Sequence, residues 1–462
     1  MSNALSQVVN VTFLLSNPQV STTNFGTPLL MVCEVPSGFV GLINSYASAA
    51  ELESAGFNAC HKAVLMAESI FAQNPSPSNI MVGARTFNPT QIIDLSPVNT
   101  NQGFVYSFSI VSSAAANPST QTTTPITYTV PGSATTTTTI ATAIEGLIAT
   151  AAPPGVTPTN PSAGLIVLTS ATPGVFFDLI GLPLPQNMTV FDNTADAVSG
   201  TSTAGDLDNV VAVNADAWYS VHYDHASSAQ ILGSGGIAKT VEALQKICVL
   251  NTSDTICVSQ SPSADTTSVA HVLQAETIGR TSLLYSANEL LPYSAVAWTG
   301  EMLSTTPGAA NWAFKSIAGP LPDALNSGYA ANAKAKNLNT YQTLGGRNVT
   351  LWGTTPSGWL DIEVGIDWLV ATIQSACWSV TVANQKIAYT DSGMLSYKAA
   401  VMGVLAQAVQ NGLVAPGFTV TVAPVASVSA ATRATRASPQ IKFNCTFQGA
   451  VNQVNVSGTG GF

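Results

Sequence analysis

Strand and helix patterns occupy both ends of the chain, and a long segment of different composition separates them. Residues 88–205, here called the insert, contain no Lys or Arg and a single Glu, while Thr, Ser, Pro and Ala dominate. Alternating apolar residues predict strands there at Tyr106–Ser112, Ile126–Val130, Gly164–Thr169 and Val175–Ile180, with one helix at Thr139–Ala151. The run Thr135–Thr139 is alternatively a flexible linker. We interpret the insert as a β-rich module whose lack of bases leaves few ion pairs to the rest of the chain.

The sequence on either side of the insert predicts an α/β fold. Before it, strands at Pro28–Val35 and Ile80–Val82 surround helices at Ala47–Ala55 and Ala59–Gln73. After it, helices are predicted at 227–245, 268–278, 286–303, 359–375 and 393–411, and strands at 247–250, 282–285, 349–352, 418–425 and 441–447. One face of the last helix is predicted to carry Leu395, Ala399, Met402 and Leu405.

Charge is scarce throughout the chain. Only 8% of the 462 residues are charged, against about 25% in ordinary soluble proteins. Such a surface suits a protein that covers its faces with copies of itself. The net charge of −10 argues against nucleic-acid binding, which needs clustered bases. No apolar run is long enough for a membrane-spanning helix, and the first 20 residues lack the Lys or Arg of a secretory signal.

Both ends of the chain carry strand patterns without a local partner. Val9, Val11 and Phe13 alternate with polar residues, and Val454 and Val456 do the same near the C-terminus. The backbone donors and acceptors of a strand must bond somewhere, and the edge of a neighbouring subunit's sheet can receive them. These five residues are therefore predicted to lie in intersubunit strand arms.

A glycine-rich motif at Gly233–Thr240 comes close to two nucleotide-binding patterns. Ala238 stands where a phosphate-binding loop needs Gly, and a polar stretch precedes the motif instead of a buried strand. We therefore interpret the segment as the interior of a helix that tolerates its glycines.

Two groups of polar residues are candidates for catalytic or metal sites. His222, Asp224 and His225 lie close in sequence, but a strand would point the two histidines to opposite faces, so we favour a polar strand end. Asp361, Glu363 and Asp367 invite a hydrolase interpretation. Their place at the start of a helix favours stabilisation of the helix dipole instead.

Cysteine and tryptophan give weaker signals. The six Cys show no metal-binding spacing, and Cys60 with His61 is the one Cys/His neighbour pair, so we expect mostly reduced, buried thiols. Trp is enriched after residue 290, which favours core packing over interface contacts, although both remain open.

Several short segments occur in an order that carries a resemblance. They are Ser6–Thr12, Phe25–Leu30, Ala47–Leu52, Gly365–Leu369, Lys386–Gly393, Asn411–Gly417 and Arg433–Pro439. With the final strands they span most of the chain outside the insert. Their order resembles a contractile-tail sheath protein of a phage, in the branch that carries a long inserted domain.

The resemblance implies an α/β (α+β) sheath core built from both ends of the chain, with an inserted β-rich outer domain and extended terminal strand arms. It places an N-terminal arm at 1–22, the core at 23–87 and 206–448, the outer domain at 88–205 and a C-terminal arm at 449–462. It implies a structural subunit, not an enzyme, that polymerises as stacked hexameric rings around a tail tube and contracts to drive the tube through the cell envelope.

The same resemblance implies the surroundings of the protein. Its partners would be neighbouring sheath subunits, the tail tube protein, and baseplate and tail terminator proteins, with no cofactor, metal, nucleic acid or membrane insertion. Its place would be the virion tail, after assembly in the host cytoplasm. Two alternatives stay open. One is a β-rich surface adhesion or receptor-binding protein, and the less favoured one is a hydrolase that uses Asp361, Glu363, or His222 with His225.

Overall fold

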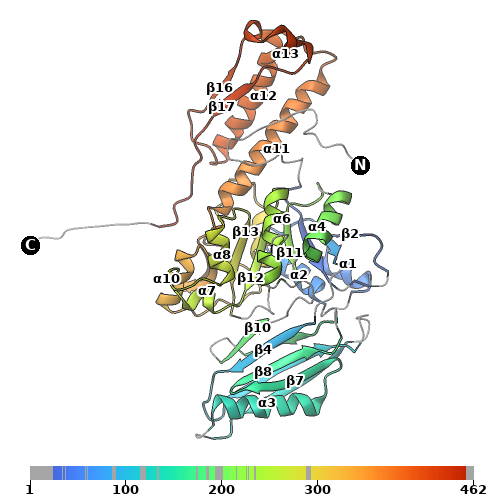
Figure 1. Ribbon diagram of the computed structural model, residues 1–462, viewed down its shortest axis with the longest axis vertical. Helices are drawn as coiled ribbons and strands as arrows, with labels where there is room; N and C mark the ends of the chain where they lie inside the picture. The colour runs from blue at the N-terminus through green and yellow to red at the C-terminus, as the bar shows by residue number, and fades with distance from the viewer. Residues whose placement is uncertain are drawn as a thin grey trace, which may run out of the picture. The chain divides into compact units, whose positions relative to one another are not determined.

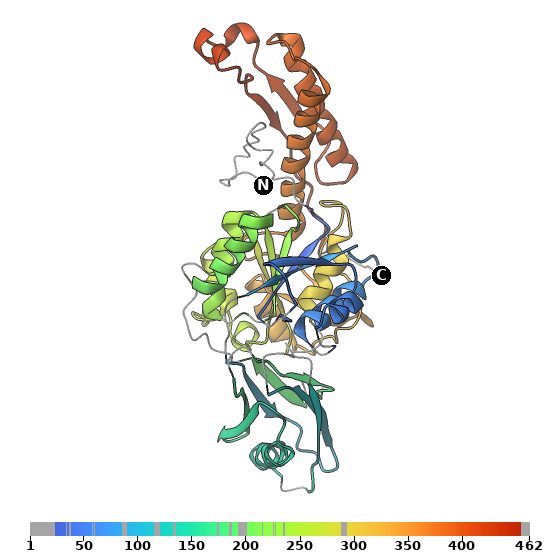
Figure 2. The same cartoon turned by 90° about the vertical axis from the view of Figure 1, so that its right-hand side faces the viewer.

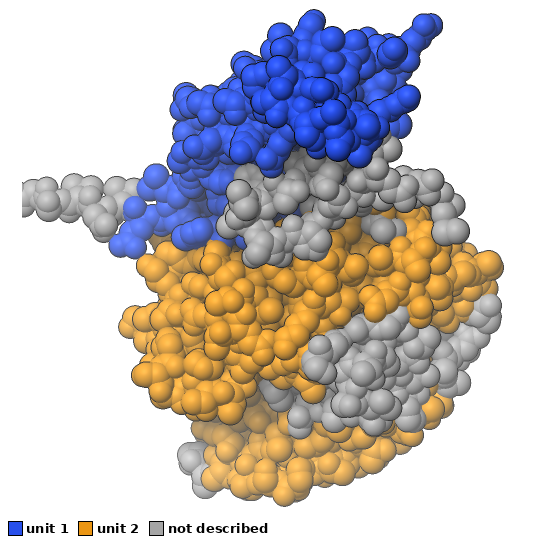
Figure 3. Space-filling view, turned by 45° about the horizontal axis from the view of Figure 1, so that its top comes forward, with its two compact units in different colours: residues 1–23, 306–313, 359–462 blue, residues 24–305, 314–358 orange. Residues whose placement is uncertain are grey.

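The computed structural model divides the chain into two compact units. Unit 1 comprises residues 1–23, 306–313 and 359–462, and unit 2 comprises residues 24–305 and 314–358 (Figure 3). The structure describes residues 24–453 apart from residues 34, 37, 58, 60, 86–89, 115–120, 133–134, 173–174, 184–186, 193–200, 215, 225, 227, 234–235 and 288–292. The predicted mixed α/β fold class is confirmed.

An eight-stranded sheet forms the centre of unit 2. Its order is β15-β14-β13-β12-β11-β1-β3-β2. The strands are β1 (Pro28–Val32), β2 (Ile43–Tyr46), β3 (Ile80–Ala84), β11 (Ser220–Tyr223), β12 (Ile247–Thr252), β13 (Thr281–Tyr285), β14 (Asn339–Leu344) and β15 (Arg347–Leu351). The six inner strands run parallel, while β2 and β15 pair antiparallel at the two edges. The central strands β1 and β3 are almost wholly buried and apolar, and β12 and β13 are almost wholly buried, as parallel strands covered on both faces require.

Helices cover both faces of this sheet. One face packs against α1 (Ala49–Ser54), α2 (Lys62–Phe71) and α9 (Ser294–Leu303). The other packs against α4 (Thr201–Asn214), α5 (Ser228–Leu232), α6 (Ile237–Leu244), α7 (Ile256–Ser259), α8 (Val269–Ala275) and α10 (Ser327–Ala335). The alternation within β1 explains the two cores, because Leu30 and Val32 face the first group while Leu29 and Met31 face the second. The result is a three-layer doubly wound architecture.

The insert folds into two antiparallel sheets and a helix. One sheet has the order β10-β4-β8-β7 and the other β6-β5-β9. The elements are β4 (Ile92–Pro97), β5 (Val105–Ser112), β6 (Thr122–Thr129), α3 (Thr137–Ala151), β7 (Val156–Ser162), β8 (Leu165–Ser170), β9 (Asp178–Ile180) and β10 (Met188–Asp192). Ile140, Ile144 and Ile148 line one side of α3 and close a single core with the inward side chains of both sheets. Figure 1 shows α3 lying across β7 and β8.

Unit 1 is built from a helical hairpin and a short sheet. The long helices α11 (Leu360–Ala383) and α12 (Asp391–Gln410) lie side by side in both views (Figures 1 and 2). β16 (Thr419–Val422) pairs antiparallel with β17 (Ile441–Asn444), and η2 (Val425–Ser427) and α13 (Ala430–Ala434) lie between these strands in sequence. Leu369, Ile373, Leu405 and Val420 belong to their shared apolar core.

Two helix predictions need correction. The predicted helix 227–245 is two helices, α5 and α6, with Gly233 and Gly236 between them. A Cβ atom at Gly236 would lie 2.7 Å from the Gln230 carbonyl oxygen, so glycine is needed where the chain turns. In α12, Leu405 is buried, but Leu395 and Met402 are 54% and 43% exposed, so the four predicted residues do not share one buried face.

Candidate functional site

The strand order of the large sheet reverses at β1. From β1 the chain forms β3 on one side and later β11 on the other. Open α/β sheets bind ligands at such a switch point, in the crevice at the carboxyl ends of the strands. The residues that follow β1, β3 and β11 are Cys33, Arg85 and Asp224, so these three side chains define the candidate site.

A buried ion pair occupies this position. A guanidinium nitrogen of Arg85 lies 2.7 Å from Oδ1 of Asp224, and the two side chains are 0% and 2% exposed. The Cys33 backbone N–H donates to Oδ2 of the same carboxylate at 2.6 Å. The aromatic ring of Tyr223 lies 5.2 Å from the guanidinium carbon. A buried charge pair needs additional hydrogen bonds to offset its desolvation, and this carboxylate receives them from the strand ends.

Lys62 and Phe176 complete the cluster. Lys62 begins α2, and its ammonium group donates to the Asp224 carbonyl oxygen at 3.4 Å. The same ammonium lies 5.2 Å from the centre of the Phe176 ring, which belongs to the insert. Burial raises the pKa of the Cys33 thiol well above its ordinary value, so this thiol is held in its protonated, poorly nucleophilic form. The protein's own side chains therefore fill the switch point.

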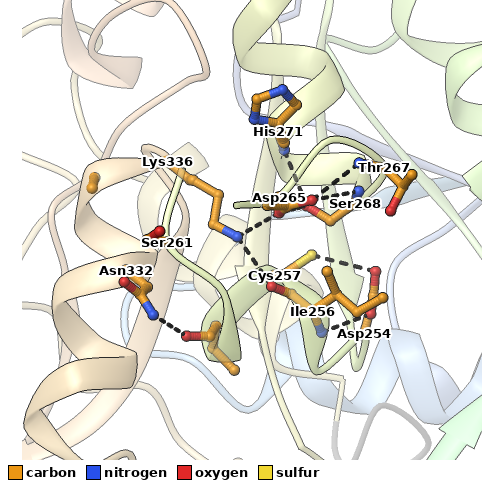
Figure 4. Close-up of polar contacts among 12 residues, drawn as sticks. Asp254, Ile256, Cys257, Ser261, Asp265, Thr267, Ser268, His271, Asn332 and Lys336 are labelled. Carbon is orange, nitrogen blue, oxygen red and sulfur yellow. Dashed lines mark hydrogen bonds and ion pairs between the residues drawn. The ribbon is translucent and has the colours of Figure 1, made fainter. Parts of the chain in front are cut away.

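A second buried ion pair joins α10 to the segment before α8. Figure 4 shows Lys336, which ends α10, reaching Asp265. The ammonium nitrogen lies 2.5 Å from Oδ2 of Asp265 and also donates to the Ile256 carbonyl at 3.0 Å. Both charged side chains are fully buried. Burial alone would raise the pKa of Asp265, but Lys336 and the hydrogen bonds from Ser268 and Thr267 lower it well below its usual range.

Of the two histidines considered for a metal site, the structure describes His222. It lies in β11, as the strand interpretation expected, and is fully buried. Its Nδ1 is 2.9 Å from the Val249 carbonyl and its Nε2 is 3.2 Å from Ser220 Oγ. Burial lowers the pKa of His222 to about 4, which keeps the ring neutral. His225 lies outside the described residues, and the described part of the chain holds no cluster of three or more metal-ligating side chains.

The three acids near residue 360 lie on α11, as predicted. Asp361 and Glu363 are in its first turn, where carboxylates stabilise the positive end of the helix dipole. Burial raises the pKa of Asp361. Asp367 is 1% exposed, one turn further along the helix, and it contributes to the interior of unit 1.

The glycine motif does not have the geometry of a phosphate loop. The element before it is α5, whereas both nucleotide-binding motifs follow a strand. Lys239, the lysine of the motif, makes an exposed ion pair with Glu276 at 3.4 Å. Ser234 and Gly235 lie outside the described residues.

The described cysteines mostly lie in the interior, as expected, whereas only three of the seven tryptophans (Trp218, Trp298 and Trp312) are buried. Cys33, Cys248, Cys257 and Cys377 are buried free thiols, and Cys445 is a half-buried one. Trp298 and Trp312 are buried, whereas Trp359 is 44% exposed.

The predicted arm residues Val9, Val11, Phe13, Val454 and Val456 lie outside the described residues. The segment just before the predicted C-terminal arm is described, and its backbone bonds to the segment that follows α12. The Ala415 N–H donates to the Thr446 carbonyl at 2.7 Å, and the Gln448 N–H donates to the Leu413 carbonyl at 2.8 Å. Among the described residues, β16 and β17 pair only with each other, so each presents an outer edge.

One family model matches the C-terminal part of unit 1. Residues 360–459 match the family model described as "E217 tail sheath protein gp31-like, C-terminal domain". No curated protein matches the chain. The match covers α11, α12, β16 and β17, and it confirms the resemblance to tail sheath proteins. No helix in the described part of the chain has the length and apolar character needed to span a membrane.

Three solved structures are similar along most of their length. A chain of the anti-feeding prophage (AFP) baseplate is 11% identical and covers 98% of this chain and 99% of its own, with a TM-score of 0.46. The sheath tail protein Lin1278 from Listeria innocua is 11% identical, with coverages of 93% and 96% and a TM-score of 0.43. The sheath complex of an extracellular contractile injection system, PVC, in its contracted state, is 10% identical, with coverages of 98% and 96% and a TM-score of 0.47.

Proposed function

We propose that this chain, whose residues 360–459 match tail sheath proteins, is the repeating subunit of a contractile tail sheath. In this proposal it polymerises as stacked hexameric rings around a tail tube and shortens to drive the tube through a cell envelope. The family match over the C-terminal unit is the observation that carries the proposal. The subunit acts mechanically, without a catalytic centre or cofactor, and its place is the virion tail, after assembly in the host cytoplasm.

For this role we propose the domain boundaries that the sequence predicts. Residues 23–87 and 206–448 form the sheath core, residues 88–205 an outer domain, and residues 1–22 and 449–462 the arms. A two-stranded sheet such as β16–β17 is marginal by itself, and arms from neighbouring copies are suitable strands to extend it. Each added backbone hydrogen bond is worth only about 1 kcal/mol, but several per arm, repeated through the lattice, hold a polymer.

Electron microscopy of the purified full chain tests the polymer, and arm variants test the mechanism. We expect tubes or rings in negative stain from the full chain. Removal of residues 1–18 or 450–462 should abolish them while the melting temperature changes little. A matched pair at one position, Val11→Pro and Val11→Thr, separates strand pairing from side-chain loss, because proline removes a backbone donor and threonine keeps the strand. Normal tubes from Val11→Pro would refute strand exchange by the N-terminal arm.

The charged residues of unit 1 support a partner with an acidic surface. Our candidate for this partner is the tail tube protein. Residues 384–444 carry five bases and one acid, Asp391, whereas residues 24–358 carry nine bases and 20 acids. The segments that hold Lys386, Arg433 and Arg436 lie together, because Asp391 accepts the Val425 N–H at 2.6 Å and the Tyr389 hydroxyl donates to the Ala437 carbonyl at 2.9 Å. Arg433→Gln with Arg436→Gln should weaken co-sedimentation with the tube, most strongly at low salt. Equal co-sedimentation of variant and parent would contradict this surface assignment.

A further inference from the structure

The insert contributes one of its few charges to the interior of the protein. Asp178 begins β9 and is 4% exposed. Burial raises the pKa of Asp178 to about 7, while the nearby Lys62 ammonium opposes this rise and the Asp224 carboxylate adds to it. The insert therefore has electrostatic contact with the α/β part despite its lack of bases, because Asp178 lies within electrostatic range of Lys62 and the Phe176 ring lies 5.2 Å from the same ammonium.

The residues beside Asp178 are held firmly from within the insert. The Gln91 side chain accepts the Phe177 N–H at 2.7 Å and donates to the Phe177 carbonyl at 3.0 Å. Gln91 is itself 1% exposed, and its backbone N–H donates to Ser170 Oγ at 2.8 Å. Phe176 and Asp178 flank Phe177, so hydrogen bonds within the insert hold the backbone between these two residues.

We propose that the carboxyl edge of the eight-stranded sheet is a docking site for the chain's own insert. Phe176 packs against the Lys62 ammonium at this edge, and Asp178 lies within electrostatic range of Lys62 and Asp224. The aromatic ring lies over the Lys62 ammonium, which is the geometry of a cation–π contact. The Arg85–Asp224 pair is balanced in charge, and the raised pKa of Asp178 lowers the negative charge that the insert brings into the interior.

This docking gives the insert a fixed orientation on the α/β part. If only the two connecting segments joined the insert to the α/β part, the insert could rotate about these segments. A buried contact between the Phe176 ring and a charged group opposes that rotation. The inference is independent of the proposed sheath function, because it concerns contacts within one chain. It assigns the switch point to an internal contact between two parts of the protein.

Hydrogen exchange of the full chain tests the docking. The Cys33, Arg85 and Asp224 amides donate hydrogen bonds at this edge and report its opening. Phe176→Ala should speed their exchange at least tenfold. The matched control is Phe104→Ala, which removes an aromatic ring from the core of the insert away from the sheet edge and should leave those three amides unchanged.

A double-mutant cycle keeps the test decisive if Phe176→Ala fails to fold. Lys62→Met and Asp178→Asn each keep approximate side-chain size and remove one charge. At pH 8 we expect the Cys33 amide to exchange less than threefold faster in the double variant than in the faster of the two single variants, because both substitutions remove the same interaction. Effects that simply multiply would overturn the proposal, as would unchanged exchange in a folded Phe176→Ala variant.

Discussion

Loss of the Lys336 ammonium should destabilise unit 2 more than loss of any exposed base. The Lys336→Met change leaves the Asp265 carboxylate buried without its cation, although Ser268 and Thr267 still donate to it. Breaking one partner of a buried pair costs about 3–5 kcal/mol. Domains of ~150–250 residues shift by about 2–4 °C per kcal/mol and larger ones by less, so the melting temperature of unit 2 should fall by several degrees, at most about 20 °C.

Lys239→Met is the matched control. Lys239 also pairs with an acid, Glu276, but the two side chains are 45% and 39% exposed. Exposed pairs contribute about 0–1 kcal/mol, so the melting temperature should move by no more than a few degrees. The double variant Lys336→Met with Asp265→Asn should recover part of the loss, since no unpaired charge then stays buried. Equal melting shifts for Lys336→Met and Lys239→Met would refute the reasoning.

Acid titration gives a second readout of the same pair. The pKa of Asp265 is lowered in the folded state, so its contribution to stability is present above the unfolded pKa of about 3.9 and is lost as the pH falls below it. The parent protein should therefore lose stability more steeply than the Lys336→Met variant as the pH falls from about 4 towards 2. Differential scanning fluorimetry across this range measures the difference.

Three further outcomes are expected. Burial raises the pKa values of Asp178 and Asp323 to about 7, so the folded protein is more stable when these groups are protonated, and this stability is lost between about pH 4 and pH 7. The double variant Asp178→Asn with Asp323→Asn should remove this loss, so its melting temperature should change less with pH over this range than that of the parent. Gly300→Ala should lower the melting temperature, at a cost of roughly 1–3 kcal/mol, because the new Cβ would lie 2.9 Å from the Ile70 Cα atom. In contrast, the new Cβ of Gly146→Ala would meet open space on α3, so this variant should be more stable by about 1 kcal/mol. Asp361→Asn with Glu363→Gln should cost at most ~1 kcal/mol for each helix-terminal charge, and a fall in any hydrolytic activity of the purified protein would contradict their structural role.

Strand periodicity predicted β1, β3, β12 and β13 of the large sheet, but it missed β14 there and β4, β7 and β10 in the insert. β7 was missed because Pro158 and Pro161 interrupt its pattern, and the prediction for β6 began only at Ile126, after Pro125. Both strands lie at the edge of their sheets, where a residue without an N–H is tolerated. A rule that treats proline as a strand breaker therefore fails where tertiary context supplies an edge.

The buried pair at the switch point could not be predicted from the sequence. Arg85 and Asp224 are separated by 139 residues, and the insert lies between them. Local spacing carries no information about such a pair. The available signal was that each charge directly follows an apolar strand, which places both at the same edge of a parallel sheet once the strands are known to be neighbours.

The placement of the charges makes the surface of unit 2 poorer in bases than the composition implies. Lys62, Arg85, Lys246, Arg280 and Lys336 are all buried, so more than half of the nine bases among residues 24–358 do not reach solvent. In unit 1, Lys386, Arg433, Arg436 and Lys442 are exposed. Unit 2 thus keeps a mainly acidic surface while unit 1 displays bases, a difference that charge totals for the whole chain conceal. In a protein proposed to polymerise, opposite surfaces of this kind favour contacts between unlike parts of neighbouring copies and disfavour contacts between like parts.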